Sequence, residues 1–145
     1  MEIVDTVYLV AYFRPSDNLH DDAIRIIESL DEERKVSEAA LIELDLLMKS
    51  RGFRPIERIQ TWKFLDKLIN RDFVELVTPL DMAVATYLLE KYGMEYFDSI
   101  VAAQCILREA KPLTTDDDII RIISMSERII DELKDLGIAL VGSRG

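Results

Sequence analysis

The stretch EIVDTVYLVAYF, residues 2–13, places the acidic residue Asp5 between two apolar segments. Ile3 and Val4 predict a short buried strand, and TVYLVAYF predicts an apolar helix that ends near Arg14, because a residue that precedes proline is disfavoured in a helix. A carboxylate at the end of a buried strand is costly through desolvation unless a cation or a proton offsets its charge. Asp5 is therefore the first candidate functional residue.

The alternation of strand and helix continues along the chain. Helices are expected over about 21–30, 38–50, 56–71, 80–93, 97–110, 118–123 and 126–137, and short strands over 35–36, 73–78, 112–116 and 138–142. Strands separated by helices of this length are typical of a parallel sheet covered on both faces. We expect an α/β protein with a three-layer α/β/α fold, a central, mostly parallel sheet of about five short strands, and a single domain over residues 1–145.

The composition narrows the class of protein. Hydrophobic residues make up 49% of the 145 residues, and no apolar run reaches the roughly 18 residues of a membrane span. The N-terminus lacks the basic leader of a signal peptide. The one cysteine, Cys105, lies in an apolar helical segment and is expected in the core. These features favour a cytoplasmic protein without disulfide bonds or membrane contact.

Three further acidic residues lie beside apolar segments, as Asp5 does. Glu43 lies in the helical stretch AALIELDLLM, Asp98 precedes SIVAAQCIL, and Asp116 follows the strand at Leu113. In parallel α/β sheets, ligands bind beyond the carboxyl ends of the strands, where we expect these acids to meet. Carboxylate oxygens are the ligands that Mg²⁺ and Mn²⁺ prefer. The sequence thus predicts an all-oxygen cation site.

The sequence does not contain the residue patterns of other common types of active site. No serine or cysteine nucleophile stands with a matching base, and the one histidine, His20, is interpreted as a local cap or a surface residue. The phosphate-binding glycine loop, the cysteine-based zinc pattern and the dinucleotide fingerprint are all missing. Most enzyme classes other than metal-dependent hydrolases are thereby excluded.

Positive charge is concentrated in one segment of an acidic chain. The formal net charge is −10, yet residues 49–71 contain seven basic and two acidic residues. This segment is interpreted either as a solvated helix face or as a surface for RNA or a protein partner. Trp62 is expected in core or interface contacts. The candidate contact residues are Lys49, Arg51, Arg54, Arg58, Lys63 and Lys67.

Four motifs in order, IVDTVYLVAYF, VSEAALIEL, YFDSIVAAQC and LTTDDD, resemble the PIN domain family over almost the whole chain. The resemblance maps the acids of that family's metal site onto Asp5, Glu43, Asp98 and Asp116, with Asp118 as an auxiliary ligand. Glu38 and Asp45 flank Glu43, but Glu38 lies near the N-cap and Asp45 lies off the same helix face, so Glu43 is favoured.

The resemblance implies a metal-dependent endoribonuclease that hydrolyses RNA phosphodiester bonds with Mg²⁺ or Mn²⁺. It also implies the toxin of a toxin–antitoxin pair, with a small antitoxin protein as partner, and a homodimer. Thr6 and Thr114 are candidates to hydrogen-bond the acidic ligands. The alternative is a PIN-like interaction module without nuclease activity that docks an acidic partner. The complete set of four acids favours the nuclease.

Overall fold

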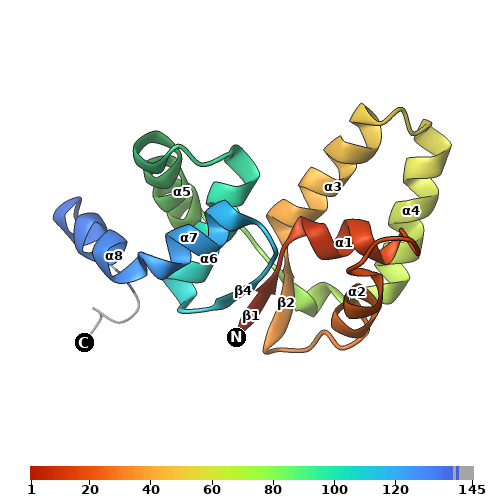
Figure 1. Cartoon of the computed structure of the whole chain (residues 1–145), viewed down its shortest axis with the longest axis horizontal. Coiled ribbons are helices and arrows are strands. Elements are labelled where there is room, and N and C mark those ends of the chain that lie inside the picture. Colours follow the sequence, from red (N-terminus) through yellow and green to blue (C-terminus); the bar gives the residue numbers. More distant parts are fainter. Residues whose placement is uncertain (139, 141–145) are drawn as a thin grey trace.

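A parallel sheet of four strands lies at the centre of the protein (Figure 1), for which the computed structural model describes residues 1–138 and 140. The strands are β1 (Glu2–Val4), β2 (Arg34–Ser37), β3 (Val74–Glu75) and β4 (Lys111–Leu113). Their order across the sheet is β3-β2-β1-β4, and every pair is parallel. The carboxyl ends of the strands therefore share one edge of the sheet.

Helices cover both faces of this sheet. In Figure 1, α1 to α4 form one half of the molecule and α5 to α8 the other, with the strands between them. The bounds are α1 Thr6–Tyr12, α2 His20–Ile27, α3 Glu38–Ser50, α4 Pro55–Leu68, α5 Pro79–Tyr92, α6 Tyr96–Arg108, α7 Asp117–Ser124 and α8 Ser126–Asp135. A short 3-10 turn, η1 (Arg71–Phe73), precedes β3. Among the described helices, none has both the length and the apolar character needed to cross a membrane.

The two halves have separate hydrophobic cores, because successive strand residues point to opposite faces. Ile3 is fully buried among side chains of α5 to α8, whereas its neighbour Val4 is buried among side chains of α1 to α4. Cys105 is buried in the first of these cores, as the sequence predicts. The arrangement confirms the predicted three-layer α/β/α fold.

Some predicted boundaries differ from those observed. The helix expected over 56–71 ends at Leu68, because Ile69 adopts an extended conformation and the Asn70 side chain accepts a hydrogen bond from the backbone N–H of Asp72. The strand expected over 73–78 is confined to Val74–Glu75, since Thr78 already caps α5. The strand expected over 138–142 falls mostly on residues 139, 141 and 142, which lie outside the described residues.

A buried polar network connects the sheet with α5 and α6. Ser37 donates a hydrogen bond of 2.6 Å to Gln104, and both side chains are fully buried. Arg108, at the end of α6, donates to both carboxylate oxygens of the fully buried Asp81, at 2.7 and 2.8 Å. Arg108 also contacts Glu75 at 2.5 Å. The network fixes α6 against the sheet, and α6 carries Asp98.

Candidate metal centre

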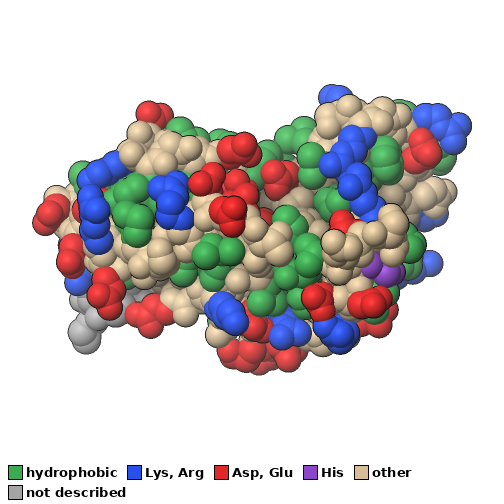
Figure 2. All heavy atoms as spheres, in the orientation of Figure 1, with side chains coloured by type: hydrophobic (Ala, Val, Ile, Leu, Met, Phe, Trp, Pro, Cys, Tyr) green, Lys and Arg blue, Asp and Glu red, His purple; other side chains and the backbone are tan. Residues whose placement is uncertain are grey.

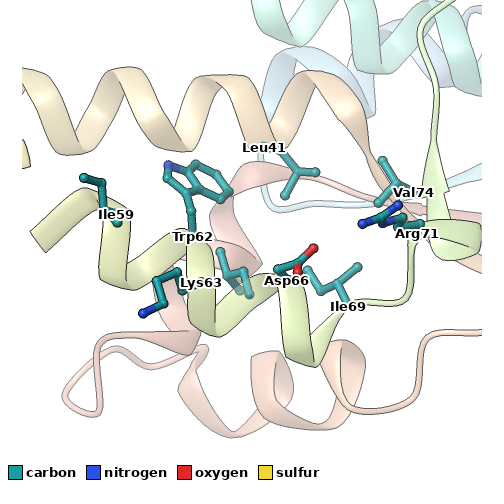
Figure 3. A pocket seen from close by; sticks show the side chains of 9 residues that line it. Leu41, Ile59, Trp62, Lys63, Asp66, Ile69, Arg71 and Val74 are labelled. Atoms are coloured by element: carbon teal, nitrogen blue, oxygen red, sulfur yellow. The ribbon is translucent and has the colours of Figure 1, made fainter. Parts of the chain in front are cut away.

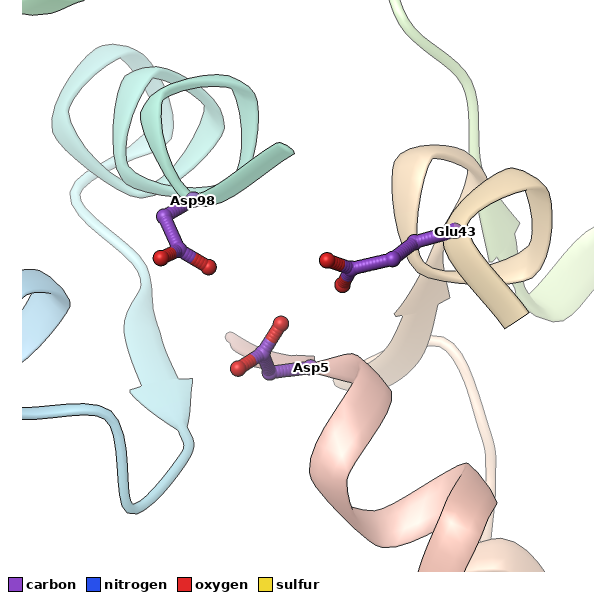
Figure 4. Close-up of side chains that lie close together, drawn as sticks. All are labelled: Asp5, Glu43 and Asp98. Atoms are coloured by element: carbon purple, nitrogen blue, oxygen red, sulfur yellow. The ribbon is translucent and has the colours of Figure 1, made fainter. Parts of the chain in front are cut away.

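Three carboxylates from different parts of the chain converge at the carboxyl edge of the sheet (Figure 4). Asp5 follows β1, Glu43 comes from α3, and Asp98 comes from the first turn of α6. One oxygen of each lies within 4.8 Å of those of the other two. The convergence follows from the parallel topology, because β1 and the helices α3 and α6 all meet at this edge.

Asp5 is the most deeply buried of the three, with 2% of its surface exposed. It occupies the N-cap position of α1, yet its side chain makes no cap hydrogen bond. Its Oδ2 accepts a hydrogen bond of 2.7 Å from Thr114. Its Oδ1 is buried and has no hydrogen-bond partner among the described residues. Burial raises the pKa of Asp5, and the Thr114 hydrogen bond lowers it in part.

Glu43 is held by Thr6, whose hydroxyl donates a hydrogen bond of 2.5 Å to Oε1. Burial raises the pKa of Glu43, the Thr6 hydrogen bond lowers it, and the charge of Asp5 raises it again. The neighbouring acids are bound elsewhere. Glu38 accepts a hydrogen bond from the backbone N–H of Val77, while Asp45 accepts hydrogen bonds from side chains of α4. Of these acids of α3, only Glu43 belongs to the converging group of described carboxylates.

Asp98 is the carboxylate whose ionisation is most strongly altered. Burial raises its pKa, and together with the negative charges of Asp116, Asp5 and Glu43 brings it to about 7. The positive end of the α6 dipole favours an anion at this position, but the loss of solvent and the repulsion between carboxylates outweigh it. A group of acids in this state would be stabilised by a cation.

Asp116 and Asp118 are placed differently from the three converging acids. Asp116 is close enough for its charge to raise the pKa values of the other three acids, but its Oδ1 accepts a hydrogen bond from the Ile119 backbone N–H and so caps α7. Thr114 links Asp116 to Asp5, because its hydroxyl accepts from the Asp116 N–H and donates to Asp5. Asp118 is exposed and pairs with Arg121 at 3.4 Å.

A fifth acid near this group, Glu95, is absent from the sequence-based prediction. It is the N-cap residue of α6, and its charge raises the pKa of both Glu43 and Asp98. The signal was available in the sequence, because Glu95 precedes Asp98 by three residues and residues three apart share a helix face.

The residues present fit a hard divalent cation. The donor set consists of carboxylate oxygens only, which suits Mg²⁺ or Mn²⁺. Thr6 and Thr114 each fix one oxygen of a carboxylate, Glu43 Oε1 and Asp5 Oδ2. The buried Oδ1 of Asp5 is then left with an unused lone pair. Because buried polar atoms nearly always have a partner, this oxygen is suited to bind a cation.

The basic residues of the 49–71 segment gather away from the acids. Figure 2 shows Asp and Glu side chains over the notch between the two halves, and Lys and Arg side chains where α3 and α4 meet. Of the six candidate contact residues, Arg58 pairs with Asp45 at 2.6 Å and Arg54 with Glu57 at 3.3 Å. Lys49, Arg51, Lys63 and Lys67 are exposed and have no ion pair among the described residues.

Two other features noted in the sequence have structural roles. His20 is the first residue of α2, and its Nδ1 lies 2.8 Å from the carbonyl oxygen of Ala11. Trp62 packs against the core and donates a hydrogen bond to Asp45. It also lines a hollow of about 550 Å³ between α3 and α4, with Leu41 and Ile69 (Figure 3). This hollow contains one carboxylate, Asp66, and is therefore no candidate for the acidic site.

The fold and the site define a parallel α/β protein with an acidic centre at the carboxyl edge of its sheet. The family model of the PIN domain matches residues 3–124, and the chain belongs to this family. Comparison with curated proteins gave no match. The resemblance seen in the sequence is thus confirmed.

Solved structures show the same fold. VapC20 of Mycobacterium tuberculosis superposes with a TM-score of 0.61 at 21% identity, over 83% of this chain and 94% of that one. FitAcB of Neisseria gonorrhoeae superposes with a TM-score of 0.63 at 16% identity, over 84% of this chain and 92% of that one. At these identities the likeness concerns the fold alone.

The raised pKa values predict how stability depends on pH and metal. An acid whose pKa is higher in the folded protein binds more protons there, so its contribution to stability is lost as pH rises through the folded value. For Asp98 this window runs from 3.8 to about 7. In chelator, we expect the melting temperature to fall between about pH 5 and pH 8. Mn²⁺ should raise it more at the higher pH, which differential scanning fluorimetry would measure. If Mn²⁺ raised the melting temperature equally at about pH 5 and about pH 8, the result would contradict a cation site at these carboxylates.

Proposed function

We propose that this protein is an endoribonuclease that hydrolyses RNA phosphodiester bonds at a Mg²⁺ or Mn²⁺ centre held by Asp5, Glu43 and Asp98. The observation that carries the proposal is the convergence of three carboxylates, one of which, Asp5, has a buried Oδ1 without a hydrogen-bond partner among the described residues. Membership of the PIN domain family supports a nuclease. Asp116 would complete the acidic set, and Asp118 is retained as an auxiliary ligand only.

Each residue then has a task set by its surroundings. Asp5 and Asp98, both largely buried, bind the cation. Thr114 and Thr6 keep Asp5 and Glu43 in place through their hydrogen bonds. Glu43 is half-buried, and because Thr6 holds its Oε1, its Oε2 would bind the cation or orient the attacking water. A bound divalent ion would acidify that water and neutralise charge on the phosphate.

The biological setting proposed is that of a toxin controlled by an antitoxin. VapC20, which shares the fold, is described as a toxin that cleaves the sarcin–ricin loop. By analogy, the present protein would act in the cytoplasm as a single domain and a homodimer, with RNA as substrate and a small antitoxin protein as partner. The analogy supports the class of substrate and leaves the particular RNA to experiment.

A direct assay would test this function. Purified protein is mixed with a single-stranded RNA that carries a fluorophore and a quencher, in Mn²⁺, in Mg²⁺ and in chelator. We expect fluorescence to rise in either metal and to stay flat in chelator. A folded protein, free of partner, that cleaves no RNA in either metal would contradict the proposal. That result would favour the interaction module, which docks an acidic partner through its basic segment.

A further inference from the structure

A small pocket lies at the far end of the two helices that carry part of the acidic site. Its volume is about 210 Å³, and it lies where the C-terminal ends of α1 and α3 meet the segment that leads into α4. Its wall is mostly apolar, with two arginines beside it. Its lining includes Val10, Phe13, Arg14, Leu47, Arg51 and Phe53.

The pocket lies about one helix length, roughly 10 to 12 Å, from the carboxylates Asp5 and Glu43. Asp5 directly precedes α1 and Phe13 follows its last residue, so the seven residues of α1 separate them. At 1.5 Å per residue, this helix is about 10 Å long. On α3, Glu43 and Arg51 are eight residues apart, or about 12 Å along the helix axis. A few nucleotides of single-stranded RNA would span this distance from a phosphate at the acidic site.

The aromatic residues at the pocket are unusually accessible. Phe13 is 40% exposed and Phe53 is 44% exposed. Phe13 is held by edge contacts with Tyr12, at 5.3 Å between ring centroids, and with Phe64, at 6.0 Å. Phe64 is itself 46% exposed. Exposed rings fixed in this way offer apolar faces on which nucleobases can stack.

The charges at the pocket favour a polyanion. Arg14 and Arg51 are exposed, and their side chains form no ion pair or hydrogen bond with another described residue. Lys63, beside Phe64 on α4, is also exposed and unpaired within the described part of the chain. In a protein of net charge −10, RNA needs such uncommitted cations to approach an acidic centre, because phosphate binding depends on positive surface.

We propose that this pocket binds a nucleobase of the single-stranded RNA substrate, with Arg14 and Arg51 contacting the adjacent phosphates and Phe13 stacking on the base. The inference rests on the proposed ribonuclease function and deepens it, because it assigns a substrate-binding subsite about 10 Å from the acidic centre. It follows from the juxtaposition of exposed aromatic rings and unpaired arginines on the helices that position Asp5 and Glu43.

The test measures RNA binding without cleavage. A fluorescein-labelled single-stranded RNA dodecamer is titrated with protein in chelator, and its fluorescence anisotropy is followed at several salt concentrations. We expect the charge reversal Arg14→Glu with Arg51→Glu to weaken binding by about ten-fold or more. The slope of log affinity against log salt should become shallower by about 1.4, since each phosphate contact on single strands contributes about 0.7. Phe13→Ala should weaken binding by about five-fold or more and leave the slope unchanged.

A matched control removes the effect of net charge. Lys111→Glu with Lys134→Glu reverses two exposed charges, on the edge strand β4 and on α8, neither of which lines the pocket. This pair should bind the RNA within about two-fold of the parent. Equal weakening by both double variants, or none by either, would overturn the proposal.

Two further measurements separate the remaining outcomes. The first is binding of a peptide of alternating leucine and glutamate to the parent and to the double arginine variant. If the variant binds this peptide more weakly than the parent but binds RNA equally well, the proposal is overturned in favour of an acidic protein partner. Cleavage of the same RNA in Mn²⁺ is measured in parallel. If the parent cleaves RNA but the arginine substitutions leave its RNA affinity unchanged, the proposed function stands and this subsite is overturned. If the parent neither cleaves nor binds RNA, both the proposed ribonuclease function and this subsite are overturned.

Discussion

Replacing Asp98 by asparagine is expected to reduce the rate of metal-dependent RNA cleavage by about a hundred-fold or more, since even residues that only support metal ligands change activity by about ten- to a hundred-fold. Asparagine keeps the shape of the side chain and removes its charge. Because burial and four neighbouring carboxylates raise the pKa of Asp98 to about 7, the ionised form destabilises the metal-free protein at higher pH. The same variant should therefore melt at a higher temperature in chelator.

This pair of opposite effects distinguishes a lost ligand from a damaged fold. Asp117→Asn is the matched control, because Asp117 is exposed at the start of α7 and carries the same charge. Its cleavage rate should stay within about three-fold of the parent, as expected of an exposed side chain that is not one of the proposed ligands. If the Asp98→Asn protein cleaves RNA as fast as the parent, Asp98 is not a ligand that cleavage requires.

Replacing Arg108 by methionine is expected to cost about 3 kcal/mol or more of unfolding free energy, the usual cost of breaking a buried ion pair from one side. Arg108 binds both oxygens of Asp81, which is fully buried and would lose its bidentate partner. It also contacts Glu75 and two backbone carbonyls. Chemical denaturation followed by circular dichroism would measure the loss.

Arg128→Met is the control for this prediction. Arg128 pairs with Glu132 at 3.3 Å on the surface of α8, and its side chain is 67% exposed. Because the Arg128 end is exposed and Glu132 keeps its contacts with Tyr87, Tyr92 and Lys91, the loss of this pair should cost at most about 1 kcal/mol. If Arg108→Met unfolds at the same denaturant concentration as Arg128→Met, the network around Asp81 does not hold α6 in place as described.

The sequence predicted the elements that bring the acids together. Asp5 could be placed because a short apolar strand precedes it, and Asp98 because an apolar helix follows it. The parallel topology, inferred from the alternation of strands and helices, then brought both to one edge of the sheet. Helix-face geometry favoured Glu43 over Asp45, and the structure shows Asp45 bound to Arg58 and Trp62 instead.

Other features depend on contacts that no local pattern reveals. Arg108 and Asp81 lie 27 residues apart, and each resembles an ordinary charged residue at the edge of an amphipathic helix. Asn70 ends α4 early through a hydrogen bond that helix propensity does not anticipate. That Oδ1 of Asp5 is buried without a hydrogen-bond partner among the described residues depends on how the side chains pack around this one atom. The ligand roles of the four acids and Asp118 stay predictions until a metal is bound.

The measurement that tests the central claim most directly is a titration of the metal-free protein with Mn²⁺, in which electron paramagnetic resonance detects the free ion. The parent and Asp117→Asn are expected to remove Mn²⁺ from solution at a saturable site, and Asp98→Asn is expected to leave most of it free. Binding that is equally weak in all three proteins, or equally strong in Asp98→Asn and the parent, would contradict a metal centre built from Asp5, Glu43 and Asp98.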